Sequence, residues 1–280
     1  MRKAMNVLLT LLTVLTVAGL AVFLYARFLE PRLLVTETVT IVSPNVSEAA
    51  EGLRIVQFSD VHVNDDDHRS KLADLTAAVN AQEPDLLVFT GDLFDAYRNF
   101  EGDPQKAAAA FTAMQAKYGK YAVLGNHDYG KDAVEATVRL LQDAGFTVLR
   151  GERTVLEELG ITITGFDDAI YARDPAETKL DGAEGFHLVL AHEPDIAETL
   201  DASLYDLMLS GHTHGGQVNL PGVEAIYLPK LGQKYKHGLY RPGGAGTRGQ
   251  LYVNRGIGES LMPVRLGSMP EVTALTLTRG

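Results

Sequence analysis

The chain has no cysteine among its 280 residues and is poor in basic side chains. Without cysteine, neither a disulfide nor a thiolate metal site can form, so any bound metal must have nitrogen and oxygen ligands. There are 25 Lys and Arg against 36 Asp and Glu, which gives a formal net charge of −11. Four of the basic residues lie in the first 32, so the rest of the chain is still more acidic. Such a surface repels polyphosphate, which argues against nucleic acid as a partner.

The sequence also lacks internal repeats and low-complexity tracts, apart from a short alanine run at 107–110. Only the N-terminal segment differs in character, because Met5 to Ala26 forms a run of 22 residues without a charge. About 20 apolar residues suffice for a helix to cross the hydrocarbon core of a bilayer. We therefore predict a membrane anchor and short linker over residues 1–36 and one domain, with a buried core, over residues 37–280.

A cleavable secretory signal is the alternative for this segment. Its apolar core is usually about 7 to 15 residues long and is followed by a small-x-small site, whereas bulky residues such as Phe23 and Tyr25 follow here. The flanking charges nearly balance, and the terminal amine favours a cytoplasmic N-terminus. This predicts a single-pass cell-membrane protein with its domain outside the cytoplasm; the cytoplasmic face is the alternative.

The region after the anchor alternates short apolar runs with helical patterns, which is typical of an α/β fold. Five runs have the character of buried strands: Arg54–Ser59, Asp85–Thr90, Lys120–Leu124, Phe186–Ala191 and Tyr205–Ser210. Three stretches have helical periodicity: Ser70–Ala81, Pro104–Lys117 and Lys131–Ala144. Two further stretches, Arg153–Gly165 and Gln250–Thr278, alternate without intervening helices and predict a second, more antiparallel sheet.

A polar cluster follows each of the five predicted strands. In chain order the clusters are Asp60 and His62; Asp92 and Asp95; Asn126, His127 and Asp128; His192; and His212 and His214. Ligand sites of open α/β sheets lie outside the carboxyl ends of the strands, so the clusters are expected to converge. Residues one apart on an extended chain point to the same side, so Asp60 with His62, and His212 with His214, are each expected to reach one site.

Taken singly, each cluster has an ordinary structural explanation. A histidine at a strand end is usually a hydrogen-bonded structural residue, and a Gly-Asp pair is usually a turn. Gathered in one place, these carboxylates and imidazoles need a cation to balance them. Mixed histidine and aspartate ligation suits Mn, Fe, Zn or a similar divalent ion.

The order of these motifs resembles the calcineurin-like metallophosphoesterases, whose pattern runs DxH, GD, GNH[DE], H and GHxH. All five motifs occur in that order between Asp60 and His214. The N-terminal apolar segment, the stretch HTHGGQV and the tail LYVNRGIG are similar to the membrane-anchored bacterial branch. That branch includes phosphodiesterases and a UDP-2,3-diacylglucosamine pyrophosphatase. The resemblance implies a four-layer α/β/β/α sandwich, here preceded by one transmembrane helix.

The resemblance also implies two divalent metal ions, with Mn²⁺ favoured and Fe, Zn or Mg as alternatives. One ion would be held by Asp60, His62, Asp92 and His214, and the other by Asp92, Asn126, His192 and His212. Two neighbouring ions lower the pKa of a water between them and clamp the phosphate oxygens. Hydroxide is then the nucleophile, so the reaction needs no serine or cysteine.

In the family, the histidine that follows the asparagine ligand protonates the leaving oxygen, which here is His127. Imidazole suits that task because its ordinary pKa lies near neutrality. Asp95 has the spacing at which related phosphatases place an aspartate that orients this histidine. Asp128 is the competing partner, and its alternative role is a hydrogen bond within the loop.

The substrate is less well defined than the reaction. About ten residues separate Ala26 from the first predicted strand near Glu37, and they reach at most about 35 Å. A lipid-linked phosphodiester or pyrophosphate is therefore the leading hypothesis, and UDP-2,3-diacylglucosamine pyrophosphatase is its most specific form. A general phosphodiesterase acting on soluble substrates and a non-catalytic metal-binding protein are the alternatives. The basic and aromatic segment Tyr227–Arg241 either binds an anionic head group or the bilayer, or is a plain surface loop.

Overall fold

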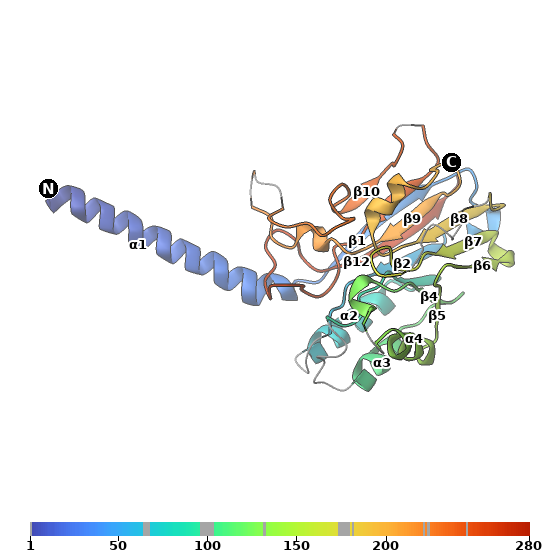
Figure 1. The fold of residues 1–280 in the computed structure, drawn as a ribbon, viewed down its shortest axis with the longest axis horizontal. Coiled ribbons are helices and arrows are strands. Elements are labelled where there is room, and N and C mark those ends of the chain that lie inside the picture. The colour runs from blue at the N-terminus through green and yellow to red at the C-terminus, as the bar shows by residue number, and fades with distance from the viewer. Residues whose placement is uncertain are drawn as a thin grey trace.

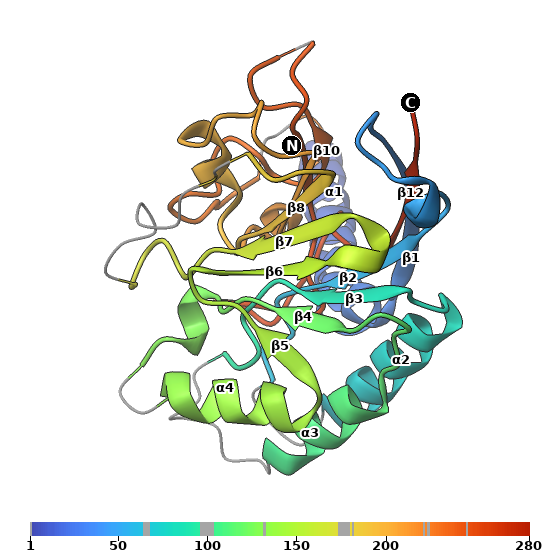
Figure 2. The same cartoon turned by 90° about the vertical axis from the view of Figure 1, so that its right-hand side faces the viewer.

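The computed structural model describes residues 2–63, 68–95, 104–130, 133–172, 180, 182–220, 222, 225–244 and 246–280. In this part of the chain, two six-stranded sheets pack face to face (Figure 2). The first sheet has the order β1-β12-β2-β3-β4-β5, with the bounds Val35–Val42, Glu271–Thr278, Arg54–Phe58, Leu86–Phe89, Lys120–Ala122 and Phe146–Val148. Strands β2 to β5 are parallel, and β12 runs antiparallel to β2 and parallel to β1.

The second sheet has the order β10-β11-β9-β8-β7-β6. Its strands are Gly238–Tyr240, Gln250–Val253, Leu207–Ser210, Phe186–Leu190, Ile161–Gly165 and Glu152–Leu156, in that order. The four central strands are parallel, and antiparallel strands close both edges. Parallel strands are usually covered on both faces, and β8 and β9 are buried along their whole length.

Three hydrophobic clusters hold the layers together. One packs the first sheet against the helices α2 (His68–Ala81), α3 (Pro104–Ala113) and α4 (Ala133–Asp143). Within it the rings of Phe58 and Phe89 are stacked, and Phe111 meets both edge-on. A second lies between the sheets, and a third covers the outer face of the second sheet. The fourth layer consists there of the 3-10 turn Pro194–Glu198 and neighbouring loops. The predicted four-layer α/β/β/α sandwich is confirmed.

The sheet assignments from the sequence were partly wrong. All five predicted strands form, but β8 and β9 belong to the second sheet, which is therefore mainly parallel instead of antiparallel. The tail Gln250–Thr278 does not stay in one sheet, because β11 lies in the second and β12 inserts between β1 and β2 of the first. Hydrophobic periodicity indicates that a strand is buried, but it does not identify the neighbouring strand.

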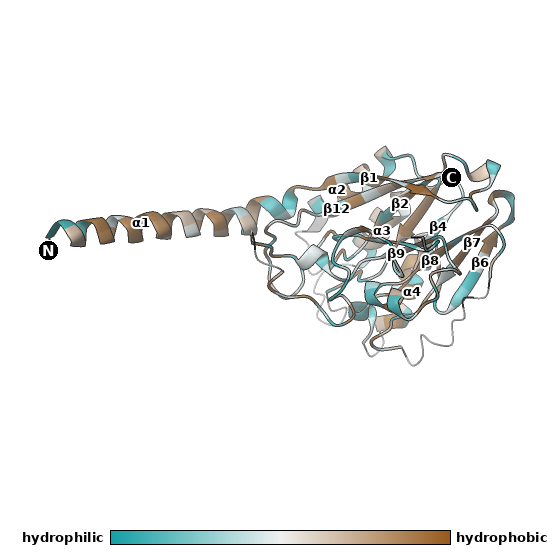
Figure 3. Cartoon of the chain, turned by 90° about the horizontal axis from the view of Figure 1, so that it is seen from above, coloured by the Kyte–Doolittle hydropathy of each residue, from teal (hydrophilic) through white to brown (hydrophobic). Residues whose placement is uncertain are grey.

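The helix α1 (Arg2–Leu24) projects away from the domain, and no residue in it is buried (Figure 1). Figure 3 shows that its surface is apolar along most of its length. Its 23 residues span about 34 Å at the usual rise, compared with about 30 Å for the hydrocarbon core of a bilayer. Length and composition are therefore sufficient to cross a membrane.

The chain just after α1 is docked on the domain. Ala26 and Glu30 are buried, and the carbonyl of Ala26 accepts a hydrogen bond from the amide of Arg265 at 2.9 Å. The Glu30 carboxylate accepts one from the Ser268 amide at 2.6 Å. The predicted boundary at residue 36 stays a prediction; the first strand, β1, begins at Val35.

Candidate metal centre

The structure brings six of the seven predicted metal ligands into two groups of three, in which one ligand atom from each residue lies within 4.8 Å of the others: Asp60, His62 and His214; and Asp92, His192 and His212. A third such group joins His127 to His62 and Asp92, and Asn126, the seventh predicted ligand, lines the same cavity as Asp92 and His212. The six residues of the first two groups are all buried. They come from the ends of β2, β3, β8 and β9, so the two sheets contribute to one centre.

The backbone at the centre has an unusual conformation. Asp60, His62, Asp92, His212 and His214 all have positive φ angles, between 48° and 73°. Such angles are uncommon for residues with a side chain, and they cluster at functional sites. The expectation that the two-residue pairs converge because the chain is extended was wrong. The chain turns at each of these residues, and the turns direct the side chains to a common point.

Glycines allow the polar loops to approach one another. A methyl group on Gly125 would lie 2.3 Å from Oδ1 of Asp92, and one on Gly211 would lie 2.2 Å from Oδ2 of Asp60. Real Cβ atoms essentially never come this close to another heavy atom. The centre therefore needs glycine at both positions.

His192 and His212 face each other through ring nitrogens, while the other nitrogen of each ring lies on a main-chain carbonyl. Nδ1 of His192 lies 2.7 Å from the Thr90 carbonyl, and Nε2 of His212 lies 2.8 Å from the Lys230 carbonyl. Since a carbonyl only accepts hydrogen bonds, each of these nitrogens carries a proton. In neutral rings the opposite nitrogens, 3.1 Å apart, then both present lone pairs. A ring fixed by a carbonyl behind it is the usual arrangement of a histidine metal ligand.

Carboxylates lie between the imidazoles. Oδ2 of Asp92 is 3.1 Å from Nε2 of His192 and 3.6 Å from Nε2 of His62, so it faces both groups of ligands. Oδ1 of Asp60 lies 3.5 Å from Nε2 of His214. Burial opposes the charge on Asp92, but the neighbouring histidines hold the pKa of its carboxyl well below the ordinary value. Asp92 is therefore ionised in the folded protein.

Burial opposes the charge on His62 and His192, but the neighbouring carboxylates raise the pKa of both imidazoles above the ordinary value. The pKa values of the other two histidines are lowered, so their rings stay neutral. Burial, helped by the charge of His192, lowers the pKa of His212 to about 4. Burial and the charges of His62 and Arg265 hold the pKa of His214 well below its usual value. A neutral imidazole is the form that binds a metal ion.

Asn126 supplies independent evidence that the centre fits a cation. Its Oδ1 is buried and has no hydrogen-bond partner in the described part of the chain. A buried, unpaired amide oxygen costs about 1–3 kcal/mol, and a metal ion would remove that cost. The donor set of carboxylate oxygens, an amide oxygen and imidazole nitrogens suits divalent Mn, Fe or Zn.

His127 lies beside this centre, with its ring 4.8 Å from that of His62 and nearly perpendicular to it. Its Nδ1 is 2.6 Å from the main-chain carbonyl of Asp95 and 3.6 Å from Oδ1 of the Asp95 carboxylate. The same carboxylate lies 3.4 Å from Nδ1 of His62. The closer contact that orients His127 thus comes from the main chain of Asp95, and a catalytic role of the Asp95 carboxylate stays a prediction.

Asp128, the competing partner for His127, has a structural role. It is fully buried and accepts hydrogen bonds of 2.9 Å from the amides of Asp92, Leu93 and Gly125. The carboxylate thus joins the loop after β3 to the loop after β4. This agrees with its alternative interpretation as a loop hydrogen bond.

Arg265 is a functional neighbour that the sequence did not reveal. It is completely buried, and its guanidinium lies 3.3 Å from Nδ1 of His214. Ser268, nearby, donates a hydrogen bond to the His214 carbonyl at 2.6 Å. Both residues stand in an apolar stretch without a motif, so only the tertiary structure shows that they support the centre.

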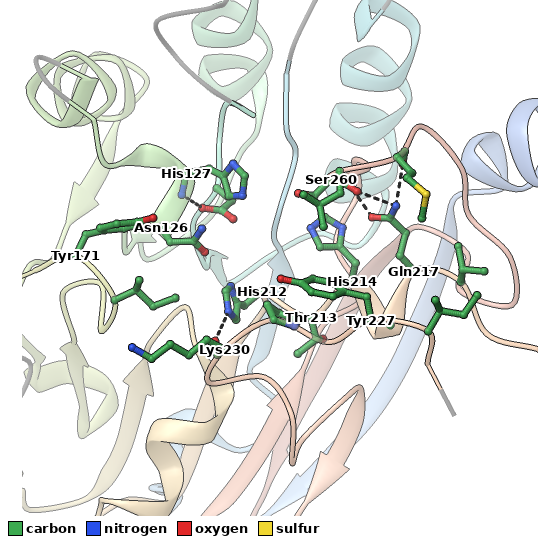
Figure 4. Close-up of a pocket in the computed structure, with 18 residues that line it drawn as sticks. Asn126, His127, Tyr171, His212, Thr213, His214, Gln217, Tyr227, Lys230 and Ser260 are labelled. Carbon is green, nitrogen blue, oxygen red and sulfur yellow. Dashed lines mark hydrogen bonds between the residues drawn. The ribbon is translucent and has the colours of Figure 1, made fainter. Parts of the chain in front are cut away.

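A cavity of about 280 Å³ opens over the centre. Asn126, His127 and Tyr171 lie on one side of it, and Gln217, Tyr227 and Ser260 lie on the other (Figure 4). Eighteen residues line the cavity, and many are apolar, among them Ile170, Val218, Ile226, Leu261 and Met262. The cavity thus joins a polar, metal-binding floor to largely apolar walls.

Comparison with known proteins agrees with the geometry. Residues 53–216 match the family described as calcineurin-like phosphoesterase. The metallophosphoesterase YkuE of Bacillus subtilis is 36% identical over 90% of this chain and 88% of its own. The phosphodiesterase YaeI of Escherichia coli is 33% identical over 81% of this chain and 83% of its own. A zebrafish (Danio rerio) transmembrane protein with a metallophosphoesterase domain is 33% identical over 96% of this chain and 62% of its own. The chain therefore belongs to the calcineurin-like phosphoesterases, a family of hydrolases that use divalent metal ions.

Proposed function

We propose that the protein is a membrane-anchored phosphoesterase that hydrolyses a phosphodiester or pyrophosphate bond of a lipid-linked substrate. Two divalent ions would act at the centre, and His127 would be the general acid. The observation that carries the proposal is the pair of ring nitrogens of His192 and His212, which face each other at 3.1 Å beside Asp92 while a main-chain carbonyl holds the other nitrogen of each ring.

The chain offers a ligand set for each ion. Asp60, His62 and His214 would hold one ion, and Asn126, His192 and His212 would hold the other, with Asp92, whose Oδ2 faces both groups, contributing to each. Ions bound there would supply Lewis acidity that activates water and screens the charge on the phosphate.

His127 is suited to move a proton to the leaving oxygen. Because its Nδ1 donates to the Asp95 carbonyl, Nε2 is the nitrogen left to hold the transferable proton. The ring is partly exposed and lines the cavity, so a bound phosphate ester can reach it. General acid catalysis of this kind contributes about 10²- to 10⁴-fold to a rate.

Two features support a lipid-linked substrate. The helix α1 is long and apolar enough to span a membrane, and the catalytic cavity carries apolar side chains next to its polar floor. A hydrophobic chain attached to the phosphate would lie against those walls. A UDP-2,3-diacylglucosamine-type pyrophosphate is the most specific candidate, and the side of the membrane on which the domain lies is best tested with C-terminal reporter fusions.

The decisive experiment compares the full-length protein in detergent, loaded with Mn²⁺, with its His127→Ala variant. Substrates would be a phosphodiester, a phosphomonoester and UDP-2,3-diacylglucosamine, and the diester would be supplied with a nitrophenol and with an alkyl alcohol as leaving group. A general acid matters most for the poor leaving group. We therefore expect a loss of about 10²- to 10⁴-fold for the alkyl ester, a smaller loss for the nitrophenyl ester, and unchanged bound metal.

His237→Ala is the matched control, because His237 is an exposed histidine that does not line the cavity. This variant should retain the parent activity. Equal losses for both leaving groups would show that His127 acts in some other way. A parent protein that binds metal fully and turns over none of the substrates would favour the non-catalytic alternative.

A further inference from the structure

Exposed apolar side chains gather around the point where α1 joins the domain. Past Tyr25, the described part of the chain has twelve large apolar side chains that are exposed. Eight of them form what we call the collar: Phe28, Leu29, Leu33, Leu220, Ile226, Tyr227, Leu261 and Met262. Each is at least 41% exposed, and Leu261 reaches 76%. Exposed apolar surface of this density usually marks a binding surface.

The collar is held together by hydrogen bonds. Gln217 donates from Nε2 to the carbonyls of Ser260 and Met262 at 2.9 and 2.8 Å, and Val218 forms a bridge with Leu266. Residues 217–220 and 225–227 form one loop region, and residues 258–268 form the other; these hydrogen bonds join the two regions. They lie at the end of the domain from which α1 emerges (Figure 1).

The second loop is also fixed to the end of the helix. The Arg265 amide donates to the Ala26 carbonyl, only two residues beyond the last residue of α1, Leu24. Met262 is three residues from Arg265, a distance of at most about 11 Å along the chain. If α1 spans a bilayer, Leu24 lies near the hydrocarbon boundary, so Met262 lies within reach of the interfacial zone. Gln217, bonded to the Met262 carbonyl, brings the other loop beside it.

We propose that the collar enters the headgroup region of the leaflet next to Leu24 and holds the mouth of the catalytic cavity at the membrane surface. The inference rests on the proposed membrane span of α1. Four collar residues, Ile226, Tyr227, Leu261 and Met262, also line the cavity. The apolar walls of the cavity are thus continuous with the surface that meets lipid, and a lipid substrate enters from the leaflet without crossing water.

The flanking chemistry agrees with a lipid partner. The guanidinium of Arg27 lies 5.1 Å from the centre of the Phe28 ring, and aromatic and basic residues together are typical of a membrane boundary. Amphipathic surfaces of this type bury their apolar side about 5–10 Å into the headgroup and acyl boundary. Continuity with α1 favours the bilayer over a second protein as the occupant.

The absence of tryptophan from the chain allows a direct test with single introduced tryptophans. The full-length protein would carry Leu261→Trp or Leu220→Trp and be reconstituted in phosphatidylcholine and phosphatidylglycerol vesicles, with or without brominated acyl chains. Val155→Trp is the matched control: Val155 is 47% exposed and lies on β6, at the far end of the domain from α1 (Figure 1). Leu12→Trp, in the middle of α1, reports the span itself.

We expect bromine to quench the Leu261→Trp and Leu220→Trp emission by about twofold or more, as for interfacial side chains, with a shift to shorter wavelength. Val155→Trp should be unaffected, and Leu12→Trp should be quenched most. Loop tryptophans that behave like Val155→Trp while Leu12→Trp is quenched would overturn the proposal. So would a blue shift without quenching, which would indicate a protein occupant. An unquenched Leu12→Trp would refute the membrane span and this inference together. Because fluorescence requires no turnover, none of these results depends on the proposed chemistry.

Discussion

Replacing Gly211 by alanine tests whether the close approach of the loops sets the metal centre. The new methyl group would lie 2.2 Å from Oδ2 of Asp60 and 2.0 Å from Oγ of Ser59. Ordinary contacts begin near 3.4 Å, so one of the two loops must move by about 1 Å, a displacement that can cost about 10²-fold in rate when it affects a catalytic group. Gly211 does not have a positive φ angle, so the effect is steric and not one of backbone strain.

We expect Gly211→Ala to weaken Mn²⁺ binding by about 10- to 100-fold, the range seen when the support of a metal ligand is altered. Overpacking should also lower the stability of the metal-free protein by about 1–3 kcal/mol. Metal content after equilibration at graded free Mn²⁺, measured by elemental analysis, checks the first effect, and denaturant unfolding checks the second. Gly182→Ala is the control, because a methyl group there meets no described residue within 4 Å.

A second variant separates the two contacts. Ser59 Oγ is buried without a hydrogen-bond partner among the described residues, so Ser59→Ala removes the shortest contact at little cost, although the Cβ of residue 59 still lies 2.8 Å from the new methyl group. The double variant should recover part of the stability but not the metal affinity, because the contact with Asp60 remains. If Gly211→Ala binds Mn²⁺ as tightly as the parent, Asp60 is not held in place by this loop, and our account of the centre is wrong.

Three further predictions concern charge, metal and proton transfer. Burial opposes the charge of Asp206, but Arg248 and other donors, including the amide of His187, hold its pKa below the ordinary value. The stability that ionised Asp206 contributes to the fold is therefore complete above about pH 4, the ordinary pKa of aspartate. It is lost as the pH falls through the lower pKa that Asp206 has in the folded protein. Asp206→Asn should lower the free energy of unfolding by about 3 kcal/mol at pH 7. It should also reduce the loss of stability between about pH 4 and lower pH, as measured by urea unfolding. If the variant loses stability in acid as the parent does, Asp206 is not the group responsible. Removing metal with a chelator should lower the Tm, and adding Mn²⁺ at about 100 times its Kd should raise the free energy of unfolding by about 2.7 kcal/mol. A Tm that does not change with metal would argue against a metal site in the folded protein. Asp95→Asn should reduce kcat by less than His127→Ala does, because the main-chain carbonyl still orients the ring; equal losses would mean that the carboxylate is essential.

The sequence by itself determined the family and the building blocks. Five motifs from Asp60 to His214 follow the family's pattern, and carboxylates and imidazoles gathered at this density indicate a bound cation. Buried strands and helices were identified by their periodicity, and α1 by its length without charge. These features are local, so the order of residues along the chain is enough to reveal them.

Only the tertiary structure decided how these parts meet. The sequence did not show that β12 inserts into the first sheet or that β8 belongs to the second, because strand pairing depends on contacts between distant segments. It also gave no sign that Arg265 reaches His214 or that the loops turn through positive φ angles at the ligands. The collar likewise exists only because two loops far from α1 in the sequence are bonded to its end. A sequence pattern records which side chains are buried or polar, whereas the packing of distant segments determines which of them share a site.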